Sequence, residues 1–143
     1  MAILETLLSK FRGVFNAEAE AVASSPGRLD FLNTHQDYKG LPVVSVGVNL
    51  RSYVAMRKTN DADATIISLN MMEEKLPFKD SFKVEKVELK EKRWFGNYLR
   101  AAIIALRERG HSIRGFRAAV LSQVPIGGGL GSSAAFTVSF IGA

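Results

Sequence analysis

The chain has 143 residues, of which 47% are hydrophobic and 23% charged, so it is long enough for one globular domain with a substantial core. It has no cysteine, which excludes disulfides and thiolate metal sites, and no apolar run near the roughly 18 residues of a membrane span. The net charge of +5 is modest, and the densest charged stretch, residues 83–93, mixes Lys and Glu as a solvated face does. We therefore expect no nucleic-acid or membrane partner, and a cytoplasmic location.

Apolar periodicity predicts helices and strands that mix without strict alternation. The elements expected, in chain order, are an amphipathic helix at 1–20, strands at 21–23 and 28–32 separated by a break at 24–27, a polar loop at 33–40, paired strands at 43–54 turning near Asn49 or Arg51, a turn at 60–63, strands at 65–69 and 82–89, a helix at 97–110, a strand at 116–124 and a helix from Ser132. This order favours an α+β fold over a doubly wound sheet, in one domain over residues 1–143.

Much of the chemical information lies in one glycine-rich run near the end of the chain. It reads Val124-Pro125-Ile126-Gly127-Gly128-Gly129-Leu130-Gly131-Ser132-Ser133-Ala134-Ala135. Glycines allow positive φ and close approach of a ligand to the backbone, and the two serines are expected to cap the helix that follows. The start of such a helix binds anions, most often phosphate. The run lacks the lysine of a P-loop and the glycine register of a dinucleotide fingerprint.

A second dense segment runs from Ser25 to Gly40. Arg28 and Asp30 flank Leu29, so in a strand they point to the same face. Thr34, His35 and Asp37 then crowd one short loop, where carboxylate, hydroxyl and imidazole groups suit hydrogen bonding to sugar hydroxyls. Taken alone, the same residues also fit a solvated turn, with Arg28 as an ion-pair partner of Asp30.

Together, the two segments resemble the first and second motifs of the GHMP small-molecule kinases, the family of galactokinase, homoserine kinase, mevalonate kinase and phosphomevalonate kinase. Pro26-Gly27-Arg28 and His35-x-Asp37-Tyr38 precede the glycine run by about ninety residues, and the first segment is similar to the galactokinase signature. Asn97-Tyr98 resembles the Trp-x-Asn-Tyr element of galactokinases, with Phe95 in the tryptophan register. The resemblance implies the N-terminal, ribosomal-protein-S5-domain-2-like domain of such a kinase.

The resemblance also implies a role for each matching residue, with ATP and Mg²⁺ as cofactors and a small sugar as substrate. The glycine run would wrap the ATP triphosphate through Pro125, Gly127, Gly128, Gly129, Leu130, Gly131, Ser132, Ser133 and Ala134. Ser133, or less favourably Ser132, would reach the Mg²⁺. Arg28 would offset charge on the transferring phosphoryl group. The sugar would contact Asp30, Thr34, His35 and Asp37. Phe95 and Tyr98 would lie toward the adenine, with ordinary core packing as the alternative for both rings.

One departure leaves the substrate open. Galactokinases carry Gly-Glu-His-Thr-Asp-Tyr where this chain has Asn33-Thr34-His35-Gln36-Asp37-Tyr38, so Thr34 replaces a sugar-contacting carboxylate. Galactose, another hexose, a uronic acid or a pentose is compatible with this change.

The length of the chain also bears on the expected activity. The resemblance places the family's catalytic aspartate beyond Ala143, and the helix from Ser132 is apolar enough to be buried. We therefore expect an N-terminal portion of a longer kinase that is inactive alone.

Two alternatives to a sugar kinase are a non-catalytic ATP- and sugar-binding sensor, and a kinase of the homoserine or mevalonate type, against which Asp37-Tyr38 argues. The sequence does not predict the oligomeric state.

Overall fold

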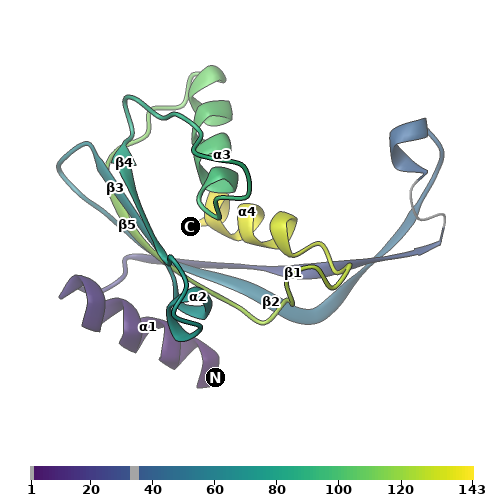
Figure 1. Cartoon of the computed structure of the whole chain (residues 1–143), viewed down its shortest axis with the longest axis horizontal. Helices are drawn as coiled ribbons and strands as arrows, with labels where there is room; N and C mark the ends of the chain where they lie inside the picture. The colour runs from purple at the N-terminus through teal and green to yellow at the C-terminus, as the bar shows by residue number, and fades with distance from the viewer. Residues whose placement is uncertain (1, 33–35) are drawn as a thin grey trace.

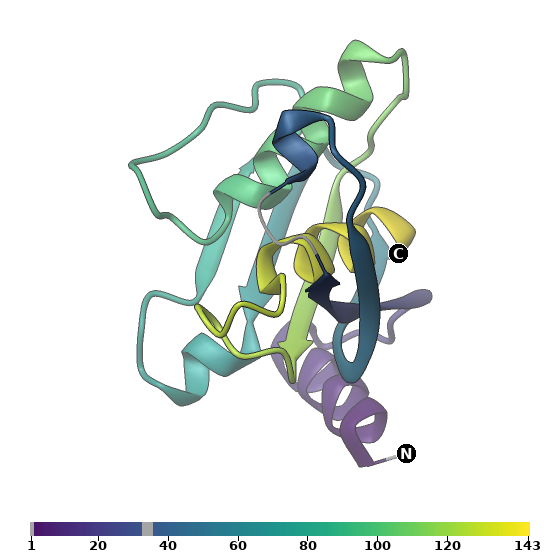
Figure 2. The ribbon, with the colours of Figure 1, turned by 90° about the vertical axis from the view of Figure 1, so that its right-hand side faces the viewer.

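The computed structural model describes residues 2–32 and 36–143, with Asp37 described by its backbone alone. It has a mixed α/β fold in which a five-stranded sheet lies between two layers of helices (Figures 1 and 2). Within the described residues, no helix combines the length and the apolar character needed to cross a membrane.

The sheet has the strand order β1-β2-β5-β3-β4. All neighbouring strands are antiparallel except β3 and β5, which are parallel. The strands are β1 (Ala21–Leu32), β2 (Val44–Lys58), β3 (Asp63–Ser68), β4 (Lys79–Lys83) and β5 (Phe116–Ser122). The helices are α1 (Ala2–Phe15) and α2 (Leu69–Glu73) on one face, α3 (Asn97–Glu108) and α4 (Ser132–Gly142) on the other, and the short 3-10 helix η1 (Asp37–Lys39).

Successive residues of the central strands point to opposite faces and so build two cores. Val54, Ile66 and Ala118 are buried in the core beneath α3 and α4, together with Leu99, Ile103, Phe116 and Phe140. Their strand neighbours Ala55, Ile67 and Ala119 are buried in the opposite core with Leu7 and Phe11 of α1. Because β3, β5 and the inner half of β2 are buried on both faces, they are apolar at successive positions.

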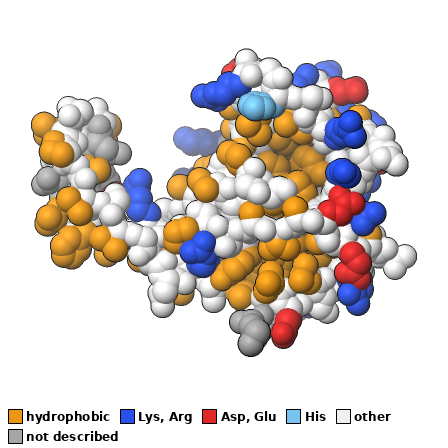
Figure 3. Space-filling model, turned by 180° about the vertical axis from the view of Figure 1, so that it is seen from behind, with side chains coloured by type: hydrophobic (Ala, Val, Ile, Leu, Met, Phe, Trp, Pro, Cys, Tyr) orange, Lys and Arg blue, Asp and Glu red, His pale blue; other side chains and the backbone are white. Residues whose placement is uncertain are grey.

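The outer halves of β1 and β2 continue beyond the helices as an arm, described over residues 28–32 and 36–50, that ends in η1 (Figure 1). Apolar side chains gather on this arm (Figure 3), and Phe31 and Tyr38 are 65% and 71% exposed. The glycine loop that joins β5 to α4, residues 123–131, lies beside the base of the arm.

Several predicted boundaries in the first part of the chain, in α1, β1 and β2, were wrong. The helix α1 ends at Phe15 rather than near Glu20. The stretch at 24–27 does not break β1; the strand continues through Pro26 with a register shift between Pro26 and Arg28. The sequence 43–54 does not form two strands, because Asn49 and Arg51 lie within the single strand β2. Pairing with β2 on both sides of this register shift outweighs the local tendency of proline and glycine to end strands.

In the second half of the chain the predicted helices at 97–110 and from Ser132 are confirmed. The fourth strand lies at Lys79–Lys83, not at 82–89, and α2 occupies a stretch predicted to be irregular. Burial of α4 is one-sided. Phe140 is buried on the sheet, but Val138 and Ile141 are 57% and 50% exposed on the outer side of the helix.

Candidate functional site

The glycine loop adopts the backbone that its composition predicts. Gly127, Gly129 and Gly131 have φ values of +73°, +71° and +64°, in the left-handed region that side chains disfavour. A Cβ atom built at Gly127 or Gly129 would meet no heavy atom within 4 Å. These positions therefore face open space, and only their lack of side chains keeps the backbone accessible to a ligand.

The loop ends at Gly131, which is the N-cap of α4. The prediction that Ser132 or Ser133 caps this helix was wrong, since both lie inside its first turn and the cap has no side-chain hydrogen bond. The first intrahelical bond runs from the Ala135 N–H to the Gly131 carbonyl, 3.0 Å away. The N–H groups of residues 132–134 precede that bond, so this end of α4 presents donors and a positive dipole end to the loop.

The two motifs, which lie about ninety residues apart in sequence, are in direct contact. The Arg28 N–H donates to the Leu130 carbonyl at 2.8 Å. A Cβ atom at Gly27 would lie 3.0 Å from that carbonyl oxygen and 3.0 Å from Val48 Cγ2, so a side chain there would push the motifs apart. A Cβ atom at Gly131 would lie 3.6 Å from Arg28 Cβ. The irregularity in β1 after Pro26 thus brings Arg28 against the end of the glycine loop.

Arg28 and Asp30 share one face of β1, as predicted. The guanidinium binds the carboxylate through two nitrogens, with Nε 3.0 Å from Oδ1 and Nη2 3.1 Å from Oδ2. The Ser45 hydroxyl on β2 donates to Asp30 Oδ1 at 2.7 Å. Because Asp30 holds Arg28 by a two-point contact, the arginine has a fixed direction while its side chain stays 54% exposed beside the glycine loop.

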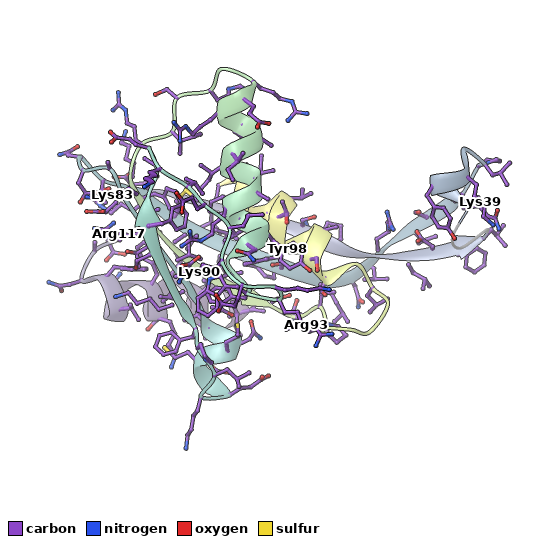
Figure 4. All side chains as sticks on the ribbon, turned by 45° about the horizontal axis from the view of Figure 1, so that its top comes forward. Lys39, Lys83, Lys90, Arg93, Tyr98 and Arg117 are labelled. Carbon is purple, nitrogen blue, oxygen red and sulfur yellow. The ribbon has the colours of Figure 1, made fainter. Side chains whose placement is uncertain are left out.

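One of the remaining predicted sugar ligands, Asp37, lies on the arm. Thr34 and His35 fall outside the described residues, and Asp37 is described only as the first residue of η1. Lys39, the last residue of η1, is labelled at the tip of the arm in Figure 4, away from the glycine loop. The sugar-contacting roles of these residues therefore stay predictions.

A buried charged network fixes the segment that leads into α3. Asp80 and Arg100 are both buried and pair through two hydrogen bonds, of 2.7 Å from Nε and 2.8 Å from Nη2. Lys90 Nζ lies 3.1 Å from Asp80 Oδ1 and 4.3 Å from the centre of the Trp94 ring. Burial raises the pKa of the Asp80 carboxyl, but hydrogen bonds, led by the one from Arg100, outweigh burial and hold that pKa below its usual value.

Asn97 completes this arrangement at the first turn of α3. Its side chain accepts from the Lys90 N–H at 2.8 Å and donates to the Lys90 and Glu91 carbonyls at 3.1 and 3.0 Å. Phe95 packs against the core under α3 and α4, as its core-packing alternative expected, and lies 5.1 Å from the Trp94 ring. Tyr98 is half exposed and lines a groove with Ala101, Thr137 and Ile141 between α3 and α4 (Figure 4). An adenine-side role for either ring stays a prediction.

Sequence reasoning missed two sets of residues, the one that supports Asp30 and the pair that fixes the segment leading into α3. Ser45 supports Asp30 across two strands, and only the β1–β2 register shows that they meet. Asp80 and Arg100 are twenty residues apart and gave a weak signal, an arginine beside the apolar positions Leu99 and Ile103 of a helix.

Comparison with known proteins agrees with the two motifs. The model of the galactokinase galactose-binding signature matches residues 9–58, and that of the GHMP kinases N terminal domain matches residues 97–143. Galactokinases of Chloroflexus aurantiacus and Roseiflexus sp. are 32% and 29% identical to the chain, over 95% and 93% of it and 34% and 32% of their own length. The chain therefore spans about a third of the length of these curated relatives.

Solved structures agree with the sequence comparison. The Lactococcus lactis galactokinase complexed with galactose superposes with a TM-score of 0.85 at 27% identity, covering 96% of this chain and 35% of that protein. The Methanococcus jannaschii mevalonate kinase, with a TM-score of 0.68 at 18% identity over 85% of this chain and 38% of that protein, shares the fold. With both motifs matched and in contact, the chain belongs to the galactokinase-like GHMP kinases and corresponds to the N-terminal part of its relatives.

Proposed function

We propose that the chain is the ATP-binding N-terminal portion of a sugar kinase that transfers the γ-phosphoryl group of ATP to a sugar hydroxyl. The observation that carries this proposal is the contact between the Gly27-Arg28 segment and the end of the glycine loop, Leu130-Gly131. In this arrangement a nucleotide on the loop would lie beside Arg28, at the base of the arm. Assignment to the ribosomal-protein-S5-domain-2-like fold class belongs to the same proposal.

The proposed phosphate site is the glycine loop with the first turn of α4. The open space over Gly127 and Gly129 and the N–H groups of residues 132–134 suit an anion, because they offer donors without side chains that would exclude it. The Ser133 hydroxyl, in the first turn of α4, is an oxygen ligand of the type that Mg²⁺ accepts beside a triphosphate. When bound there, Mg²⁺ would neutralise phosphate charge; the chain's own contribution is to hold the phosphates in place.

Arg28 would act on the group in transfer. It is exposed, always charged, and held in direction by Asp30, so it can donate to a phosphate oxygen without first being ordered. Asp30 would in this role orient Arg28, and its predicted contact with the sugar remains a proposal.

The substrate is proposed at the level of a small sugar. The signature match at residues 9–58 and the galactose complex of the Lactococcus lactis enzyme support a sugar rather than homoserine or mevalonate. Thr34, in place of the family glutamate, is the reason to test several sugars. The same replacement keeps a non-catalytic sensor as the second candidate. Inactivity of residues 1–143 alone and a cytoplasmic location stay predictions.

Asp37 is expected to bind the sugar and not the nucleotide, since a carboxylate would repel a triphosphate. In the complete protein Asp37→Ala should weaken sugar binding about fivefold, the loss of about one net hydrogen bond, and leave ATP binding nearly unchanged. Isothermal titration with each ligand separately measures both effects. Lys39→Ala, two residues away in η1, is the matched control and should change neither strongly. Lost ATP binding with intact sugar binding in Asp37→Ala would show that this loop serves the nucleotide instead.

A further inference from the structure

The side chain of Asn70 holds the end of β5 where the chain leaves the sheet for the glycine loop. Its Nδ2 donates to the Ser122 carbonyl at 2.9 Å, and its Oδ1 accepts from the Ser122 N–H at 2.8 Å. Asn70 lies in α2, outside both sequence motifs, and 52 residues from its partner. A single side chain thus satisfies both backbone polar groups of the last residue of the strand.

The sheet explains why an asparagine is used here. The last paired residues of β3 and β5 are Ser68 and Val120, because at Ser68 the chain turns from β3 into α2. Continuing the parallel ladder by two residues would pair Asn70 with Ser122, but the Asn70 backbone is already helical. Its side-chain amide has one carbonyl acceptor and an NH₂ donor, so it replaces the missing peptide group. Aspartate lacks the donor, and leucine lacks both groups.

Ser122 in turn contacts the start of the glycine loop. Its hydroxyl accepts from the Val124 N–H at 3.1 Å, while the intervening Gln123 N–H donates to the Arg51 carbonyl of β2 at 2.9 Å. Val124 is buried, and its Cγ1 lies 3.1 Å from the position of a Cβ at Gly27. The start of the loop is therefore fixed against the same part of β1 that binds the end of the loop through Leu130.

We propose that Asn70 is a positioning residue for the glycine loop, acting through Ser122 and Val124 to set the place of the loop backbone for nucleotide phosphates. The proposal rests on the proposed function in that the ligand of the loop is ATP. Both side-chain hydrogen bonds of Asn70 go to Ser122, which precedes the glycine loop, so its effect is on geometry and not on direct binding of the nucleotide.

The test is Asn70→Asp, which keeps the size and the acceptor but sets a carboxylate oxygen against the Ser122 carbonyl. In the complete protein we expect the amide resonances of the loop glycines to move in the absence of ligand. The dissociation constant for MgATP, measured by isothermal titration, should rise about threefold to tenfold, as loss of one well-placed hydrogen bond predicts. Asn70→Ser, which keeps a small polar group, serves as the second variant if Asn70→Asp does not fold.

Arg117→Gln is the matched control, because it also removes side-chain hydrogen bonds from β5. Arg117 Nη1 donates to the Asp63 carbonyl at 2.7 Å, at the other end of β5 from the glycine loop (Figure 4). This variant should lose thermal stability to a similar extent yet bind MgATP as the unmodified protein does.

The outcomes separate the positioning role from the proposed function. A folded Asn70→Asp protein with unchanged glycine resonances and unchanged MgATP affinity would overturn the positioning role alone. Equal weakening of MgATP binding by Arg117→Gln would also overturn it, because the effect would then be general loss of stability. If the unmodified protein binds no MgATP, the proposed function fails, and the positioning proposal fails with it.

Discussion

A protein in which Asp80 is replaced by asparagine should lose about 3–5 kcal/mol of unfolding free energy, a large fraction of the stability of a small domain. Asp80 is fully buried, and it is the carboxylate that the two hydrogen bonds of buried Arg100 and the ammonium of Lys90 share. Asparagine keeps the shape but removes the negative charge, which leaves the Arg100 charge uncompensated in the core. Urea unfolding followed by circular dichroism measures the change.

Two controls isolate the buried charge. Glu88→Gln breaks the exposed Lys86–Glu88 pair, at 3.7 Å, and should change stability little. The double variant Asp80→Asn with Arg100→Met should recover part of the loss, because an apolar side chain needs no counter-charge. Asp80→Asn as stable as the unmodified protein would contradict a structural role for the pair.

The same pair makes stability depend on acid. The pKa of Asp80 is lowered in the folded protein from its ordinary value of 3.8, so the folded state favours the ionised form. This contribution is fully present above the ordinary pKa and is lost as the pH falls below 3.8 through the folded pKa. The unfolding free energy of Asp80→Asn should therefore depend less on pH in this range than that of the unmodified protein, as urea unfolding at a series of pH values measures.

Gly129→Val is expected to weaken ATP binding at least tenfold in the complete protein, about 1.4 kcal/mol. The valine would project into the open space above the loop, where the phosphates are proposed to lie. Gly129 is a sharper test than Gly131, because a side chain at Gly131 would also contact Arg28. Isothermal titration with MgATP measures the effect.

The control must share the cost of a β-branched residue at positive φ, about 1–2 kcal/mol. Gly110→Val does so, since Gly110 has φ +85° and also has no heavy atom within 4 Å of a built Cβ, but it follows α3 and lies outside the glycine loop. It should destabilise the protein and leave ATP affinity unchanged. If folded Gly129→Val binds ATP as tightly as the unmodified protein, the phosphates do not lie on this loop.

Features that depend on neighbouring residues could be predicted from the sequence. The positive φ values of the loop glycines, the helix from Ser132 and the shared face of Arg28 and Asp30 all follow from local sterics and strand geometry. The family also followed from two local motifs in the correct order, because each motif is a continuous run of residues.

Features that depend on distant partners could not be predicted. Pro26 and Gly27 read as a strand break, but pairing with β2 carries β1 through them. The contacts of Asn70 with Ser122 and of Asp80 with Arg100 join residues 52 and 20 positions apart, and neither pair has a distinctive local pattern. The same holds for α4, whose apolar outer side reads as buried when only its composition is considered.

The most direct test is a titration of the complete protein, labelled with ¹⁵N-glycine, with MgATP. The chain has 12 glycines, so both the site and its controls are observed at once. The amide signals of Gly27, in the first motif, and of Gly127, Gly128, Gly129 and Gly131, in the second, should shift together with one dissociation constant. Those of Gly13, in α1, and of Gly110 and Gly115, between α3 and β5, should stay in place. Saturable shifts confined to these control glycines, or MgATP binding with no shift in the loop, would contradict a phosphate site built from the two motifs.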